Sequence, residues 1–145
     1  MKFETMEPNM IIHHRIGWKE LLFYNNNPPD IPFPKGITVY NKYKEHLTTI
    51  ENIFYYLTNY LFKQNEFFII KNADFPYYVS EYISHKILWF NPKYYNNVNY
   101  EFVNNILKRK YKNYIVFENT TKNKSVKSII HFHFFIMKTN IYHVI

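Results

Sequence analysis

The chain has 145 residues, a formal net charge of +7 and no cysteine. This length favours one domain with a core of its own, and the lack of cysteine excludes disulfides, thiolate nucleophiles and thiolate metal ligands. No run approaches the roughly 18 consecutive apolar residues of a membrane span, and residues 1–5 lack the apolar stretch of a secretory signal. We therefore expect a cytoplasmic protein.

The N-terminal part predicts an irregular segment followed by a short helix. Residues 1–16 are expected to be irregular, and residues 17–145 to form a single α+β domain. Within that domain, residues 18–24 predict a helix whose apolar face includes Leu21 and Leu22.

The next part of the chain predicts a loop and then helices. Residues 25–34 contain four prolines, which exclude both a helix and a central strand. In residues 39–62 the apolar side chains recur at steps of three and four, the spacing of an amphipathic helix. Thr48 and Glu51 have the spacing of a capping box, which predicts a break near Leu47 and hence two helices.

The second half predicts a small sheet. Helices in the first half followed by strands in the second favour an α+β fold, with N-terminal helices packed on a small, mostly antiparallel sheet that one helix crosses. The expected elements are a strand or helix end at 67–71, strands at 85–90, 114–117 and 129–137, a helix at 98–111 and a polar, basic loop at 119–127.

His131 and His133 form the sharpest local motif. On a strand they share one face with Phe135, and the side chains between them face the other way. With His85 on a second strand, they give an alternative prediction of a metal site or an acid–base pair. No carboxylate lies nearby in sequence to orient the rings, so the simpler interpretation is a strand with one solvated face. No catalytic residue, metal or cofactor is assigned.

Other enzyme motifs are missing from the sequence. Two glycines are too few for a glycine-rich phosphate loop, and no G-x-S-x-G turn occurs. We therefore expect neither catalysis nor a small-molecule substrate.

The positive charge favours a polyanion as the partner. A first basic cluster, at 108–112, ends the predicted helix at 98–111, where the helix dipole alone favours cations. A second basic cluster follows in the loop at 119–127, and the two together predict a shared phosphate-binding patch. Tyr94 and Tyr95 are candidates for stacking on unpaired bases. The predicted RNA-binding patch comprises Arg15, Lys108, Arg109, Lys110, Lys112, Lys122, Lys124 and Lys127.

Six short motifs follow one another along the chain, namely WKEL at 18–21, NADFPY at 72–77, HKILW at 85–89, VFEN at 116–119, SVKSI at 125–129 and HFHF at 131–134. This order is similar to that of small eukaryotic proteins, common in fungi, that are catalogued as a domain of unknown function. Their members carry a D-W-P-Y turn, in which Phe75 replaces the tryptophan here, and a closing H-F-H strand.

Among such proteins the chain resembles the microsporidian dormancy factors, which sit on idle ribosomes near the tRNA exit site and the messenger path. The resemblance implies a monomer that binds rRNA and ribosomal proteins and silences translation sterically. Two alternatives stay open. One is an enzyme that uses His85, His131 and His133, and the other is an adaptor that binds only protein.

Overall fold

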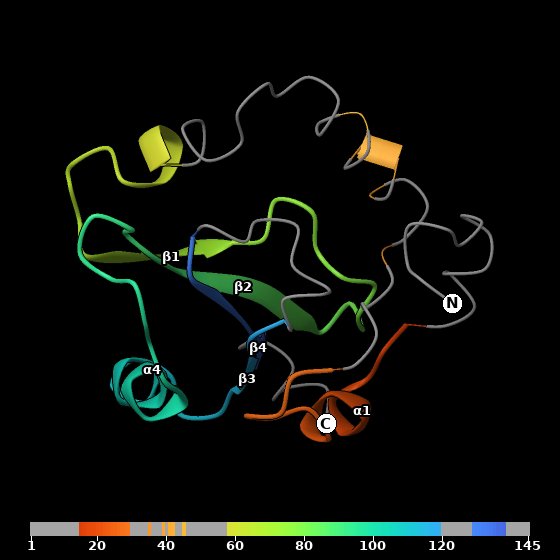
Figure 1. The fold of residues 1–145 in the computed structure, drawn as a ribbon. Coiled ribbons are helices and arrows are strands. Elements are labelled where there is room, and N and C mark those ends of the chain that lie inside the picture. The colour runs from red at the N-terminus through yellow and green to blue at the C-terminus, as the bar shows by residue number, and fades with distance from the viewer. Residues whose placement is uncertain are drawn as a thin grey trace.

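The described part of this computed structural model is a mixed α+β fold. No helix within it is long and apolar enough to cross a membrane. The described residues are 15–29, 35, 39, 41–42, 45, 58–119 and 129–138. The elements are α1 (Trp18–Leu22), β1 (Phe68–Asn72), β2 (Ile83–Phe90), α4 (Tyr100–Leu107), β3 (Ile115–Phe117) and β4 (His131–Met137) (Figure 1).

Several predicted features lie outside the described residues. They include residues 1–14, most of the helical region at 39–62 with Thr48 and Glu51, and the loop beyond Asn119.

The four strands form one antiparallel sheet in the order β1-β2-β4-β3. The two central strands pair from Ile83 opposite Met137 to Trp89 opposite His131. The α+β prediction with an antiparallel sheet is therefore confirmed. The segment at 67–71, which the sequence left open between strand and helix end, is a strand.

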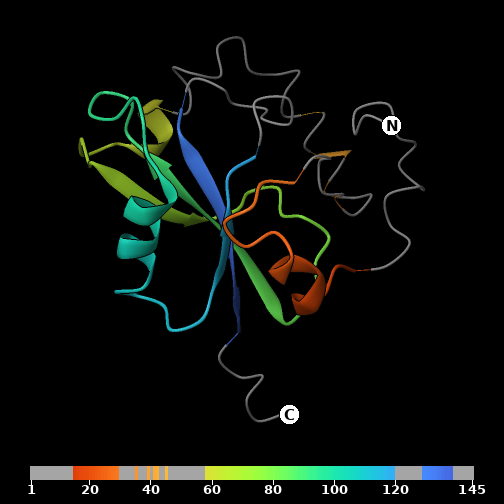
Figure 2. The same cartoon turned by 60° about the horizontal axis from the view of Figure 1, so that its bottom comes forward.

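The two faces of the sheet pack against different layers. On one face, Leu88 and Phe134 pack against Val103 and Leu107 of α4. On the other face, Phe135 shares a cluster with Leu21 of α1. In both views α1 and α4 accordingly lie on opposite sides of the sheet (Figures 1 and 2).

Two sequence predictions about helix faces are wrong. Leu22 was expected beside Leu21 on the apolar face of α1, but it is 49% exposed whereas Leu21 is fully buried. The spacing of Phe102, Val103, Ile106 and Leu107 predicts that all four share the apolar side of α4, but Phe102 is 40% exposed. Both errors have the same cause, since adjacent apolar positions on a helix face about 100° apart and the sheet can cover only one of them.

The turn after α1 covers one edge of the sheet. Asn26 has a positive φ of 55°, and its backbone N–H donates to Val116 O at 2.7 Å. The Asn25 side-chain oxygen accepts the Val116 N–H at 3.1 Å. The N–H and the C=O of Val116 in β3 are thus both hydrogen-bonded, so at this residue the edge of the sheet cannot pair with a further strand. The opposite edge is β1, and no other described strand pairs with it.

Candidate functional site

The three predicted histidines lie together within the sheet. The alternation predicted for β4 is confirmed, because Phe135 packs in the cluster on one face and Phe134 in the cluster on the other. The expectation of a solvated face is wrong, since His131 is only 4% exposed and His133 only 7%. Both faces of β4 are covered, so these imidazoles are buried side chains.

A directional chain of hydrogen bonds runs through two of the histidines. The backbone N–H of Tyr77 donates to His85 Nδ1 at 3.0 Å. That nitrogen is therefore an acceptor, and the proton of the neutral ring lies on Nε2. His85 Nε2 lies 2.8 Å from His133 Nδ1, so it donates there and leaves the proton of His133 on Nε2. That nitrogen lies 3.4 Å from both the Tyr77 hydroxyl and the amide of Asn119.

Burial controls the ionisation of this cluster. Burial, and then the charge of Lys35, hold the pKa of His85 well below its usual 6.5. Lys35 is itself buried, with Nζ 4.9 Å from the centre of the Tyr77 ring. Burial lowers the pKa of this ammonium to about 8. A neutral His85 beside a charged Lys35 is therefore the folded state at neutral pH.

This geometry favours a packing role for the imidazoles. Both ring nitrogens of His85 bond to other groups of the protein. His131 stacks on Trp89 with ring centres 4.5 Å apart, and its Nδ1 lies 2.8 Å from Ile129 O. Among the described residues, no group of three or more histidines and carboxylates has the arrangement of a metal site.

The structure brings four members of the predicted basic patch together. The C-cap of α4 is Lys108, and Arg109, Lys110 and Lys112 follow it in the next turn. All four side chains are exposed. None of them forms an ion pair with a carboxylate in the described parts of the chain. We call these four residues the α4 basic cluster.

The other predicted members lie elsewhere. Arg15 donates from Nη1 to Val79 O at 3.0 Å and covers the Tyr78 ring at 4.6 Å. Arg15 lies three residues before α1, and α1 is on the side of the sheet opposite α4 (Figure 2). Lys122, Lys124 and Lys127 lie outside the described residues.

The two candidate stacking tyrosines differ in exposure. Tyr94 is 39% exposed, and its ring lies 4.6 Å from that of Phe67. Tyr95 is half-buried and packs on Phe90 at 5.1 Å, as part of the core under α4. The sequence prediction missed three exposed rings nearby, which belong to Phe67, Phe68 and Phe102.

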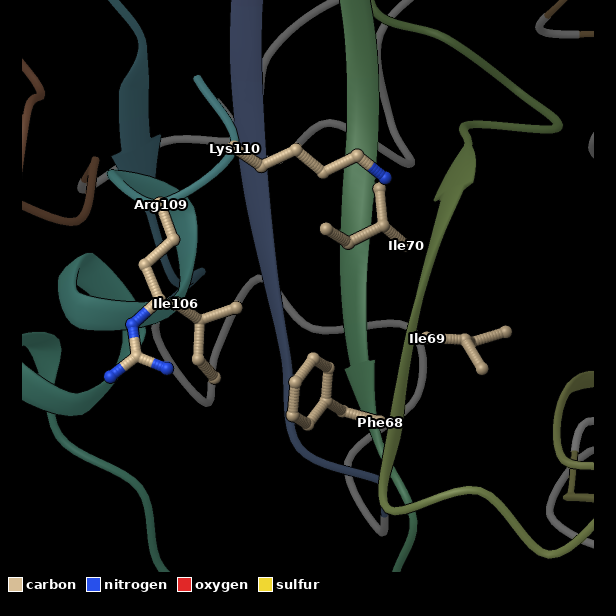
Figure 3. A pocket seen from close by; sticks show the side chains of 6 residues that line it. All are labelled: Phe68, Ile69, Ile70, Ile106, Arg109 and Lys110. Atoms are coloured by element: carbon tan, nitrogen blue, oxygen red, sulfur yellow. The ribbon is translucent and has the colours of Figure 1, made fainter. Parts of the chain in front are cut away.

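A groove opens between β1 and the end of α4. It has a volume of about 350 Å³ and is lined by Phe68, Ile69, Ile70, Ile106, Arg109 and Lys110. Figure 3 shows Phe68 and Ile70 facing Ile106 across it, whereas Ile69 points to the other side of the strand. We call it the β1–α4 groove.

Comparison with known proteins gives a family and a fold. Residues 2–137 match the family described as "Protein of unknown function (DUF3605)". The chain belongs to this family. No curated protein matches it.

A solved structure described as "Crystal Structure of HTC1" is similar, with a TM-score of 0.57 and 14% sequence identity. The match covers 84% of this chain and 85% of that one. At this identity the likeness shows that the two chains share a fold.

Proposed function

We propose that this DUF3605 chain is a ribosome-bound dormancy factor of the cytoplasm, similar to the first microsporidian dormancy factor. It binds as a monomer, occupies the region of the tRNA exit site and messenger path sterically, and so silences translation. No catalysis is involved.

The observation that carries the proposal is the α4 basic cluster. Four exposed cations within five consecutive positions, without carboxylate partners in the described residues, form a surface that attracts phosphate. Glu101 in the first turn of α4 lies at the other end of the helix, so acidic and basic side chains are separated along it. Cations in this arrangement bind RNA backbone with little sequence preference.

The ribosome as the target rests on the order of sequence motifs. A basic surface alone supports RNA binding in general and names no particular RNA. The D-F-P-Y turn at 74–77 and the H-F-H strand at 131–133 are motifs that resemble the family of small eukaryotic proteins, and among such proteins the chain resembles the dormancy factors. Tyr77, His85 and His133 bond to one another, so in this chain these motifs build the core that holds the surface in place.

Co-sedimentation with ribosomes across a salt series tests the proposal. The protein is expected to run with monosomes at low salt and to dissociate steeply as salt rises. Reversing Lys108 and Lys110 to glutamate should move dissociation to much lower salt. The matched control reverses Lys19 and Lys138, which are also exposed but lie outside α4 and the turn after it; it should behave more like the wild type.

Each contrary result has a distinct meaning. Protein that stays at the top of the gradient at low salt excludes the ribosome as the target. Binding that is nearly indifferent to salt favours the protein-only adaptor. Equal losses in both double variants would show that net charge, and not the α4 basic cluster, drives association.

A further inference from the structure

The β1–α4 groove combines an apolar floor with a cationic rim. Phe68 and Ile70 come from β1, and Ile106 comes from α4. Arg109 and Lys110 follow directly at the end of that helix, and Lys110 extends toward Ile70 (Figure 3). At about 350 Å³ the groove is at the lower end of the range of small-molecule sites, about 300–1,000 Å³.

The charge of the rim selects an anionic occupant. Neither Arg109 nor Lys110 forms an ion pair with a carboxylate in the described residues. A guanidinium matches the oxygens of a phosphate in a bidentate arrangement, and the Lys110 ammonium, which lies apart from the guanidinium in Figure 3, adds a positive charge for a second phosphate. A basic protein tail would be repelled from this rim, and a purely apolar ligand would leave both cations unused.

The floor selects a flat ring. Phe68 is 36% exposed, and its inner side is supported by Phe90, with ring centres 5.9 Å apart. An exposed ring that is fixed from behind is a platform on which an unpaired base can stack. The base would replace water over Phe68 and between Ile70 and Ile106.

We propose that the β1–α4 groove binds an unpaired nucleotide of single-stranded RNA, with its base on Phe68 and the two phosphates that flank it at Arg109 and Lys110. This inference deepens the proposed function, on which it rests, by naming where the RNA lies and which form of RNA is bound. It concerns a single strand because the bases of a duplex are stacked on each other and their faces are not available to Phe68.

A second exposed ring pair lies just before β1, outside the lining of the groove. Phe67 precedes Phe68 in the chain and is 59% exposed, and it packs against Tyr94 at 4.6 Å. Lys93 Nζ lies 5.6 Å from the centre of the Tyr94 ring. A second exposed ring and a cation thus lie within a few residues of the groove in the chain or pack on such a residue, and they are available to further nucleotides of a single strand.

Two measurements on the isolated protein locate the site. The first is fluorescence anisotropy with a labelled oligouridylate of about eight nucleotides, within the site sizes of single-strand binders. The second is an NMR titration of the wild-type protein with the same oligonucleotide. The methyl resonances of Ile70 and Ile106 are expected to shift, whereas those of Ile16 and Ile83, in the core under α1, should stay.

Matched variants test the two chemical components separately. Phe68→Ala should weaken binding about 5- to 150-fold, the effect of losing one stacked base. The control Phe23→Ala removes a more exposed ring, 73% exposed and next to α1, and should leave binding unchanged. Replacing both Arg109 and Lys110 by glutamine should reduce the slope of log K against log salt by about 1.4, the value for two phosphates of a single strand.

The outcomes distinguish this inference from the proposed function. If shifts appear only outside the groove, or if Phe68→Ala and Phe23→Ala bind alike, the groove is not the site even when ribosomes are bound. Equal, Phe68-independent binding of duplex RNA would reduce the surface to phosphate contact and overturn the inference. If an acidic apolar peptide shifts Ile70 and Ile106 and the oligonucleotide does not, the occupant is a protein. Groove binding without ribosome co-sedimentation would support this inference and refute the dormancy proposal.

Discussion

Replacing His85 with glutamine tests whether the buried imidazole stays neutral in the folded protein. Its Nδ1 accepts the Tyr77 N–H, and its Nε2 donates to His133. Burial, and then the charge of Lys35, hold the pKa of His85 well below 6.5. In the unfolded chain this ring takes up a proton below about pH 6.5, whereas in the folded protein it does not.

The size of the effect follows from the difference in bound protons. Because the folded pKa of this base is depressed, its contribution to stability is present above about pH 6.5 and is lost as the pH falls below that value. Each pH unit well below the unfolded pKa costs about 1.4 kcal/mol. Between pH 7 and pH 5 the loss from His85 alone amounts to about 1.9 kcal/mol. Glutamine does not titrate, so the variant lacks this loss.

Urea unfolding of the wild type and of His85→Gln at pH 8, 7, 6 and 5 measures this loss of stability. At pH 7 the variant should be less stable by about 1–3 kcal/mol, because glutamine does not reproduce both hydrogen bonds of the ring. The free-energy difference between the proteins should be nearly constant from pH 8 to 7 and then shrink by about 2 kcal/mol down to pH 5. Groups common to both proteins largely cancel in this difference. Parallel curves down to pH 5 would refute the reasoning, since they would show that folding does not lower the pKa of His85.

Three further substitutions have expected effects on the free energy of unfolding in urea. Lys35→Met should stabilise the protein at pH 7 by about 1–3 kcal/mol, because a pKa of about 8 in place of 10.5 reflects a buried charge. The stability of the wild type should also rise from pH 8 to 10.5 relative to that of the variant. The exposed control Lys42→Met should change stability by less than about 0.5 kcal/mol. Leu107→Ala should cost about 2–5 kcal/mol by opening a cavity under α4, against less than about 1 kcal/mol for the half-exposed Leu22→Ala. Asn104→Ala removes hydrogen bonds to Asn26 and to the Tyr100 carbonyl, both 2.8 Å long, and should cost about 1–3 kcal/mol. A variant as stable as the wild type would show that these hydrogen bonds make no net contribution to stability.

The local periodicity of the sequence was enough to predict three of the four described strands, but it left the segment of β1 open between a strand and a helix end. Residues 129–137 alternate so regularly that the division of β4 into two faces followed directly from the strand period. What covers each face could not be read in the same way. Tyr77 and Leu21 reach the histidine face from distant parts of the chain, so a solvated face was expected where the structure has a buried one.

Helix α4 shows a similar limit. Its existence follows from the apolar spacing, but Val103 and Phe102 give two overlapping stripes of equal apolarity. Only packing on Leu88 and Phe134 decides that Val103 faces the sheet and that Phe102 stays at the surface. Exposed rings therefore cannot be told from core rings by their type alone.

The β1–α4 groove could not be predicted from the sequence, for a different reason. Its floor comes from an edge strand, and its rim comes from a helix end far along the chain, so no local pattern joins Phe68 to Arg109. The cations themselves were predicted, because a basic cluster after an amphipathic stretch is visible in the residues. Their role as one side of a groove appears only once the sheet is assembled.

The same packing that buries the core sets the width of the groove. Leu107 lies in the core against the sheet, and Arg109 follows it two residues later at the rim. On the other side, β1 pairs with β2, and Leu88 and Phe90 of β2 share the cluster that holds Leu107. Floor and rim are thus connected through one set of buried side chains. Leu107→Ala alters a buried side chain and no exposed one, but it should still weaken oligonucleotide binding, because the rim of the groove would be held less firmly. Salt weakens the same binding in a different way, by screening the charges of Arg109 and Lys110.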